Sequence, residues 1–186
     1  MSRYIAFYKP YGVTSHFGEH QKHKTLSAFG LPESVYAAGR LDKDSEGLLL
    51  LTDDGPFKNE LLHPDNAHHR IYWAQVEGTP DEVAMRMLRQ GPVVGRRKSK
   101  PCEAQIMDPA PSVPDRNPPI RYRENVPETW IEIELTEGKN RQVRRMTAAV
   151  GHPTLRLIRV QIGKLNLWNL DIGEGEWTDV DRADIL

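Results

Sequence analysis

The sequence has little of several features that define large protein classes. Its 186 residues include a single cysteine, Cys102, which excludes a disulfide within the chain and a cysteine-rich zinc site. The longest aliphatic run, the four leucines at 48–51, is far shorter than the roughly 20 apolar residues of a membrane helix. The N-terminus shows no apolar core followed by a small-residue cleavage site. These absences predict a cytoplasmic protein with no membrane partner.

The usual signatures of nucleotide and nucleophile sites are also missing. The chain contains neither GxxxxGK[ST] nor GxGxxG, so we expect no nucleotide cofactor. No serine lies in a GxSxG sequence, and no base partner can be argued for Cys102.

The chain has no large excess of either charge, but its basic and acidic residues are segregated along the sequence. The 25 basic and 26 acidic residues leave a net charge of −1. Between residues 138 and 164 there is no acid, and the basic residues there are Lys139, Arg141, Arg144, Arg145, Arg156, Arg159 and Lys164. A second basic cluster comprises Arg96, Arg97, Lys98 and Lys100. These segments predict either a face that binds nucleic acid or solvated surface charges.

Hydrophobic patterning predicts an α+β fold around a mixed sheet. Alternating or β-branched runs predict strands at 3–8, 34–38, 47–52, 70–76, 103–107, 130–135 and 155–162. Helical patterns occur at 25–29, 57–62, 80–90 and 140–150. The strands and helices do not alternate strictly, which disfavours a purely parallel sheet. Six prolines between residues 108 and 128 predict a long loop.

Two of these helices show which face they bury. In the first, one face carries Val83, Ala84, Met87 and Leu88. In the second, which we expect Asn140 to cap, the apolar stripe comprises Val143, Met146, Thr147 and Val150. Arg141 and Arg145 lie opposite the stripe, whereas Arg144 lies at its edge. An arginine at such an edge can bury its stem and direct its head group toward a carboxylate or a phosphate, or simply extend into solvent.

The segment GRLDKDSEG at 39–47 supports two readings. Five residues match positions of an EF-hand calcium loop, although no amphipathic helix precedes them: Asp42, Asp44, Glu46, Gly47 and Asp53. Alternatively, the segment is a loop that places Asp42 beside a buried strand, with Arg40 two residues away. An ionised carboxylate there can act as a nucleophile or base, or can form a surface ion pair.

Three histidines, His16, His20 and His23, have a spacing that would place them on one face of a helix. A zinc site would need a further ligand, and the surrounding sequence has no helical pattern. Exposed loop histidines are the alternative, and we expect no bound metal.

Three long segments carry a resemblance to a known family. They are YKPYGVTS at 8–15, GRLDKDSEGLLLLTDDG at 39–55 and EGKNRQVRRMTAAVGHPTLRLIRVQIG at 137–163. Together they resemble the pseudouridine synthases of ribosomal RNA, in the small-subunit-synthase-like branch. The resemblance implies one catalytic domain over residues 1–186 without an S4-like RNA-binding domain. It also implies a mixed, mostly antiparallel sheet and two lobes with an active-site cleft between them.

The resemblance assigns roles residue by residue. Asp42 matches the essential aspartate, and Arg40 matches an arginine that helps fill the space of the flipped base. Tyr72 matches the tyrosine that stacks on the target uracil, and Arg144 matches the basic partner of the aspartate. Arg70 stands where the family usually has lysine. The basic residues Arg141, Arg145, Arg96, Arg97, Lys98 and Lys100 are candidates for RNA contacts.

The implied activity is the isomerisation of one uridine in large-subunit (23S) ribosomal RNA, without a cofactor. We expect a monomer whose partner is this RNA, mature or within an assembly intermediate. Two alternatives remain: a non-catalytic RNA-binding module of ribosome assembly, and a calcium-binding domain. The sequence leaves open whether Asp42 attacks the sugar C1′ or the base C6.

Overall fold

The computed structural model describes all 186 residues, which form two compact units. The first comprises Met1–Arg70 and Ile158–Leu186, and the second comprises Ile71–Leu157. The first unit is therefore built from the two ends of the chain, with the second unit inserted between them.

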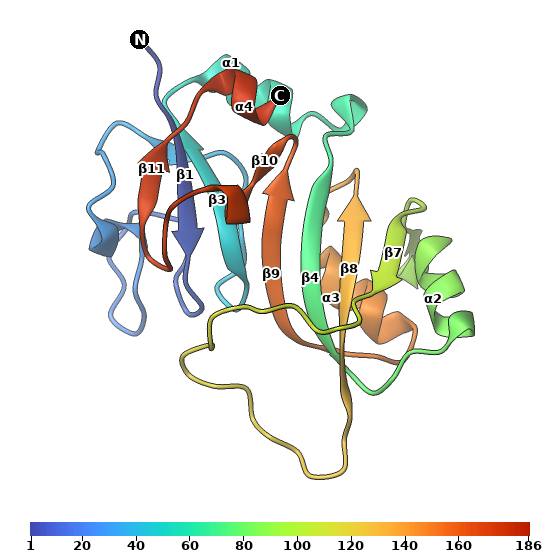
Figure 1. Cartoon of the computed structure of the whole chain (residues 1–186). Helices are drawn as coiled ribbons and strands as arrows, with labels where there is room; N and C mark the ends of the chain where they lie inside the picture. Colours follow the sequence, from blue (N-terminus) through green and yellow to red (C-terminus); the bar gives the residue numbers. More distant parts are fainter. The chain divides into compact units, whose positions relative to one another are not determined.

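The first unit contains a mixed sheet with the strand order β11-β1-β3-β9 (Figure 1). Its strands are β1 (Tyr4–Lys9), β3 (Glu46–Thr52), β9 (Thr154–Ile162) and β11 (Trp177–Asp179), with β2 (Tyr36–Ala37) beside β3 and β10 (Leu165–Asn166) beside β9. Strand β9 begins in the second unit and enters the first at Ile158. Strand β3 pairs with β1 antiparallel and with β9 parallel. The predicted α+β fold with a mixed, mostly antiparallel sheet is confirmed.

Strand β3 is the centre of the first unit, and every one of its residues is buried. Leu48 and Leu50 contribute to one apolar cluster, whereas Leu49 and Leu51 contribute to another. Successive side chains of a strand point to opposite faces, so the four-leucine run fills the core on both sides of the sheet. Full burial of each leucine contributes about 1.5–3 kcal/mol.

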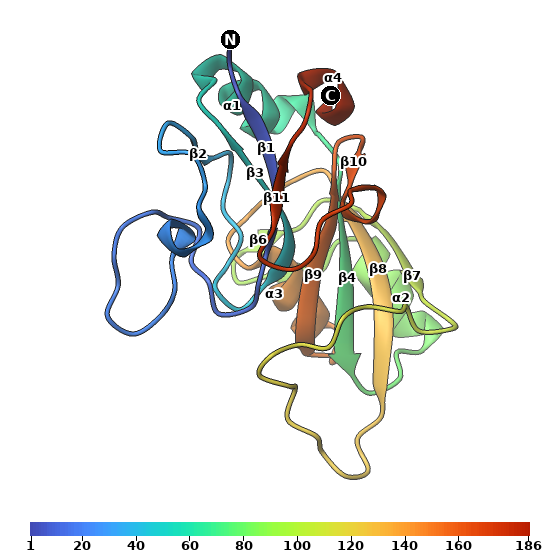
Figure 2. The ribbon, with the colours of Figure 1, turned by 60° about the vertical axis from the view of Figure 1, so that its left-hand side comes forward.

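Short helices complete the first unit. They are η1 (Leu26–Phe29), α1 (Gly55–Leu62), η2 (Pro64–Asn66), η3 (Leu167–Asn169) and α4 (Arg182–Ile185). Asp54 caps α1 by accepting a hydrogen bond from the Phe57 amide. As the sequence predicts, η1 ends at Gly30, which has a left-handed conformation with φ of 63°. A long loop connects β1 to η1 and extends away from the sheet (Figure 2).

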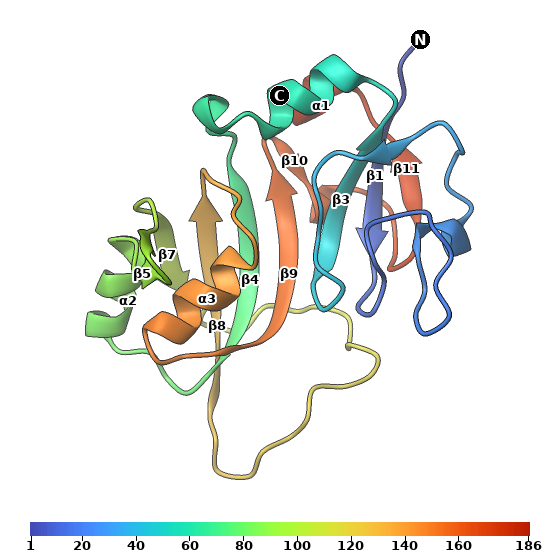
Figure 3. The ribbon, with the colours of Figure 1, turned by 180° about the vertical axis from the view of Figure 1, so that it is seen from behind.

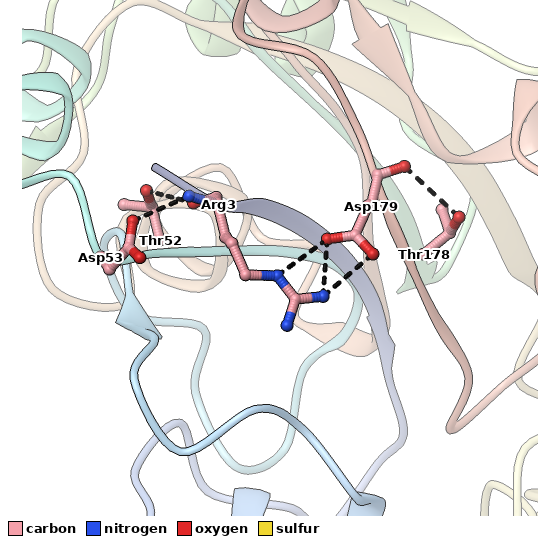
Figure 4. A network of polar contacts seen from close by, with 5 residues as sticks. All are labelled: Arg3, Thr52, Asp53, Thr178 and Asp179. Atoms are coloured by element: carbon pink, nitrogen blue, oxygen red, sulfur yellow. Dashed lines mark hydrogen bonds and ion pairs between the residues drawn. The ribbon is translucent and has the colours of Figure 1, made fainter. Parts of the chain in front are cut away.

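Polar contacts join the two ends of the chain within this unit (Figure 4). The guanidinium of Arg3 donates to both carboxylate oxygens of Asp179, at 2.8 and 3.0 Å from Nη2. The Arg3 amide donates to Asp53 Oδ1 at 2.8 Å, and Thr52 Oγ1 donates to the Arg3 carbonyl at 2.6 Å. These bonds reinforce the β11-β1-β3 pairing at its outer end.

The second unit contains the strands β4 (Arg70–Glu77), β8 (Glu128–Leu135) and β7 (Glu103–Ile106), in the order β4-β8-β7. A hairpin of β5 (Val93–Val94) and β6 (Arg97–Lys98) is added, with helices α2 (Glu82–Arg89) and α3 (Gln142–Ala149), which are seen from behind in Figure 3. Its apolar core joins residues from α2, α3 and all three strands, including Leu88, Met146, Val76, Ile133 and Ala104.

Two details of these helices differ from the sequence-based prediction. Helix α2 buries Ala84, Met85 and Leu88, whereas Val83 and Met87 are exposed, so the predicted face was wrong by one position. Asp81 caps this helix, and its side chain accepts from the Ala84 amide. Helix α3 begins after Arg141, which has a φ of 51°, and Asn140 is not its cap. The Asn140 side chain instead accepts a hydrogen bond from Arg145.

The proline-rich segment forms a loop without helices or strands between β7 and β8. Arg156 Nη2 donates to the Pro114 carbonyl at 2.7 Å, and Arg116 Nη1 reaches the Leu155 carbonyl at 3.4 Å. The loop is thus bonded to β9 at two points. None of the helices combines the length and the hydrophobicity that a membrane-spanning segment needs.

Candidate active site

Asp42 lies in the turn between β2 and β3 and is half-buried. The Ser45 amide donates to the Asp42 carbonyl at 3.0 Å and closes the turn. The Gly12 amide, from the loop after β1, donates to the Lys43 carbonyl at 2.8 Å. The backbone on both sides of Asp42 is therefore fixed within the first unit. Arg40 is exposed, two residues before Asp42.

Two side chains of the first unit also contact this turn. Ser15 Oγ donates to the Leu41 carbonyl at 2.6 Å and accepts from the Leu41 amide at 3.0 Å. Arg159, on β9, donates from Nε to the Leu48 carbonyl at 2.9 Å and from Nη1 to the Arg40 carbonyl at 3.4 Å. Both carbonyls of the dipeptide before Asp42 thus accept from side chains outside the turn.

Three charged residues are buried beneath the turn: Lys9, Glu46 and Arg159. Lys9 Nζ donates to the carbonyls of Pro10 and Val13, at 2.8 and 2.7 Å. Burial lowers the pKa of Lys9 to about 7, because the apolar surroundings disfavour the charged amine more than the nearby Glu46 carboxylate favours it. Lys9 is not among the predicted site residues, and its only signal in the sequence is a lysine at the end of an apolar strand, just before a Pro-Tyr-Gly turn.

The geometry is incompatible with the calcium hypothesis. Glu46 is fully buried at the start of β3, and Asp53 follows the end of this strand, where it accepts from the Arg3 amide. Seven strand residues at roughly 3.3 Å each separate the two carboxylates by about 20 Å, so they cannot converge on one ion. No group of three or more histidine, cysteine, aspartate or glutamate residues is arranged to hold a metal.

The three histidines lie in the loop between β1 and η1. The rings of His20 and His23 stack with their centroids 3.5 Å apart. Partial desolvation, followed by the positive fields of His20, Lys43 and His16, lowers the pKa of His23. Two rings that stack face to face are not arranged as ligands directed at one ion.

Tyr72 and Arg144 belong to the second unit. Tyr72, on β4, is half-buried, and its ring packs against the apolar core of this unit. Arg144 is also half-buried on α3, where Nη1 contacts the Thr154 carbonyl at 3.3 Å. Arg141 and Arg145 are exposed. The predicted difference between Arg144 at the edge of the apolar stripe and the exposed Arg145 is confirmed. Arg141 is exposed as predicted, but it precedes the helix and does not lie on its outer face.

The second basic cluster lies on the β5–β6 hairpin and the segment after it, and Arg96, Arg97, Lys98 and Lys100 are all exposed. The Lys100 amide donates to Glu137 Oε1 at 2.7 Å. Burial alone would raise the pKa of Glu137, but bonds from Lys100, Lys139 and Gln142 outweigh it and lower this pKa. Of the seven basic residues between 138 and 164, Arg156 and Arg159 are buried and do not contribute to a basic surface.

Cys102 is not a candidate nucleophile. Its thiol contacts the Leu88 carbonyl at 3.3 Å, and burial raises its pKa to about 11. The reactive thiolate is therefore scarce at neutral pH.

Comparison with known proteins assigns the family. A family model described as RNA pseudouridylate synthase matches residues 3–149. The chain belongs to the RNA pseudouridylate synthase family. As a member of it, this synthase is an enzyme, an isomerase that converts uridine in RNA into pseudouridine. The comparisons give no support to the alternative of a non-catalytic RNA-binding module.

Two curated relatives are similar to the synthase over most of its length. One, from Xanthomonas axonopodis pv. citri (strain 306), is named ribosomal large subunit pseudouridine synthase E and is 52% identical over 165 residues, 88% of this chain and 85% of the relative. Another with this name, from Vibrio parahaemolyticus serotype O3:K6, is 44% identical over 176 residues, 95% of this chain and 73% of the relative. The sequences RNPPIR at 116–121 and TLRLIR at 154–159 also make this synthase resemble the proteins of that name.

A solved structure shares the fold. The protein titled "Crystal structure of pseudouridylate synthase" aligns with a TM-score of 0.81 and 24% sequence identity, covering 100% of this chain and 73% of that one.

Proposed function

We propose that this synthase isomerises a uridine of large-subunit (23S) ribosomal RNA. The proposal is carried by the relatives named ribosomal large subunit pseudouridine synthase E, which are 44–52% identical to it over most of its length. We further propose that large-subunit ribosomal RNA, mature or within an assembly intermediate, is the partner of this synthase, and that the synthase acts as a monomer in the cytoplasm.

Asp42 is proposed as the catalytic residue. The reaction breaks the N-glycosidic bond, turns the uracil and rejoins it to the sugar through C5, which loses its proton while the freed N1 takes one up. This requires neither an electron acceptor nor a phosphoryl donor, so side chains suffice. An ionised carboxylate can attack C1′ or C6, and the turn around Asp42 supplies the fixed backbone that nucleophilic attack needs.

Arg40, Tyr72 and Arg144 are proposed to bind the substrate, on the family resemblance. Removing the target uridine from its stack costs a few kcal/mol. Stacking on an aromatic ring recovers about 1–3 kcal/mol, and the half-buried Tyr72 presents such a ring on a rigid strand. Arg40 is proposed to fill the space that the flipped base leaves, and Arg144 to be the basic partner of Asp42.

The test uses tritium release from RNA that carries 5-³H-uridine. The wild-type enzyme should release tritium from a large-subunit RNA fragment. Asp42→Asn should bind this RNA normally but lose turnover, because an amide is a very poor nucleophile. Asp44→Asn, a matched change in the same turn, should retain most of the activity. Wild-type turnover in the Asp42→Asn variant would refute the assignment.

The identity of the substrate is tested separately. Pseudouridine should disappear from one position of the large-subunit RNA in cells that lack the protein. It should return with the wild-type chain and not with Asp42→Asn. An unchanged large-subunit profile, together with a lost pseudouridine in another RNA, would refute the proposed substrate and leave the chemistry in place.

A further inference from the structure

The turn that carries Asp42 is held by side chains to which no catalytic role has been given. Ser15 Oγ forms two hydrogen bonds to Leu41, one to its carbonyl and one from its amide. A single hydroxyl therefore binds both the amide and the carbonyl of Leu41, the residue immediately before Asp42. The Oγ–O distance of 2.6 Å is short for a hydroxyl bond, as expected of a well-aligned contact.

Arg159 contacts the same turn from below. It is 5% exposed, and its Nη1 lies 3.4 Å from the Arg40 carbonyl while Nε is bonded to Leu48. Its Nη2 is buried without a hydrogen-bond partner. Burying a guanidinium with an unsatisfied donor costs free energy that an apolar side chain of similar size would not. Packing of the core alone therefore does not explain why an arginine occupies position 159.

We propose that Ser15 and Arg159 are positioning residues that hold the Asp42 turn in its reactive geometry. This inference rests on the proposed catalytic role of Asp42. Nucleophilic attack requires the reacting atoms to approach within about 3–3.5 Å, and a displacement of about 1 Å can reduce the rate about 100-fold. The two side chains restrain the peptides just before the nucleophile, where a small backbone rotation would move the carboxylate.

The backbone hydrogen bond from Gly12 to Lys43 restrains the peptide just after the proposed nucleophile. Lys9 supports the loop that carries Gly12. The Lys9 ammonium bonds the carbonyls of Pro10 and Val13, so the loop that carries Gly12 and Ser15 is itself anchored to the buried end of β1. The turn is thus restrained from the β1 loop on one side and from β9 on the other, with all contacts inside the first unit.

The experiment compares matched substitutions. Ser15→Ala removes the hydroxyl with little change in volume, and Thr14→Ala is its control, because Thr14 Oγ1 contacts only the Lys24 carbonyl, at 3.5 Å. Arg159→Met removes the buried guanidinium. Arg156→Met is its control, because Arg156 is equally buried on the same strand but bonds the proline-rich loop. Arg159→Lys keeps the charge and loses the fork that spans the two carbonyls.

Two quantities are measured: the single-turnover rate at saturating RNA and the RNA dissociation constant. We expect Ser15→Ala and Arg159→Met to lower the rate at least tenfold while the dissociation constant stays within about twofold. Both controls should keep the wild-type rate. Rates of Ser15→Ala and Arg159→Met within twofold of their controls would overturn the proposal, and so would an equal loss in Arg156→Met.

Hydrogen exchange in the free enzyme provides a readout that needs neither activity nor RNA. The amides of residues 40–45 should exchange faster in Ser15→Ala and Arg159→Lys than in the wild type, whereas those of β8 should not change. Unchanged exchange at 40–45 would overturn the proposal even if the rates fell. Should Arg159→Met fail to fold, Ser15→Ala and Arg159→Lys decide the question. Wild-type protein that leaves large-subunit RNA unmodified would instead refute the proposed function.

Discussion

Gly47 lies directly against the backbone of Arg159. A Cβ atom added at Gly47 would be 2.3 Å from the Arg159 carbonyl oxygen and 2.8 Å from its nitrogen. The two residues are partners in the parallel pairing of β3 with β9, and Gly47 has a φ of 106°. Strand β3 can therefore enter the sheet next to β9 only with glycine at this position, five residues after Asp42.

We predict that Gly47→Ala destabilises the protein strongly. Left-handed strain and overpacking each cost about 1–3 kcal/mol, and the neighbouring atoms are backbone that cannot move aside. Urea unfolding should report a loss of at least about 2 kcal/mol. Gly30→Ala is the matched control, since Gly30 also has positive φ but no atom lies near its missing Cβ. A similar, small loss in both variants would contradict the close approach.

The buried Lys9 predicts an unusual pH dependence of stability. Its pKa is about 7 in the folded protein, against 10.5 for an unperturbed lysine. Between pH 7 and 10.5 the unfolded chain binds more protons at Lys9 than the folded protein does, so the free energy of unfolding should rise with pH. This added stability is lost again when the pH falls toward 7. The slope from this one group is at most about 1.4 kcal/mol per pH unit.

Lys9→Met tests this prediction. The variant loses the bonds to Pro10 and Val13, and it also lacks the rise above pH 7, so the stability gap to wild type should widen as pH increases. Denaturant unfolding at several pH values between 7 and 10 measures the gap, with Lys22→Met as an exposed control. A gap that stays constant across this window would show that Lys9 remains charged when buried.

Arg144 and Arg145 are neighbours on α3 with different expected roles. Arg144 is half-buried and Arg145 is exposed. Removing each side chain in turn therefore distinguishes the effect of a residue proposed for the active site from the effect of a charge on the surface. Arg144→Ala should lower the turnover rate at saturating RNA by about 100-fold through lost orientation. Arg145→Ala should mainly weaken RNA binding. Single-turnover kinetics and filter binding measure the two effects, and equal behaviour of the two variants would contradict the role proposed for Arg144.

The β5–β6 hairpin should contribute electrostatically to RNA binding. Replacing Arg96, Arg97, Lys98 and Lys100 by glutamine removes four exposed charges. The plot of log affinity against log salt should flatten by about 0.7 per lost contact to single-stranded phosphate. The rate at saturating RNA should not change. A salt dependence identical to that of the wild type would mean that the hairpin does not contact RNA.

Much of the fold follows from local patterns in the sequence. The run EGLLLLT has apolar residues on both faces and therefore marks a fully buried strand, and the segments at 70–76 and 130–135 alternate as strands should. The predicted face of α2 is wrong because Met85 is buried and Met87 is not. These two methionines flank the buried pair Ala84 and Leu88 on opposite sides of the helix, and spacing alone does not show which of them faces the core. The basic β5–β6 hairpin was missed because its strands contain only two residues each.

The candidate site was predictable only in part. The GRLD sequence and the neighbouring segments make Asp42, Tyr72 and Arg144 candidates by resemblance alone. Composition and spacing treat a charged residue as exposed, so they give no indication that Lys9, Glu46 and Arg159 lie in the core. The hydrogen bonds of Ser15 join positions 26 residues apart, and tertiary structure alone reveals such a contact.

The division of the first unit between the two ends of the chain bears on how the enzyme is made. Strand β11, which pairs with β1, and the part of β9 from Ile158 onward, which pairs with β3, are translated only after the whole second unit. The second unit is one continuous segment and can begin to fold earlier. The Asp42 turn acquires its Arg159 contact only once β9 has emerged. A nascent chain halted before that point would carry all the proposed substrate-binding residues and still lack a fixed nucleophile.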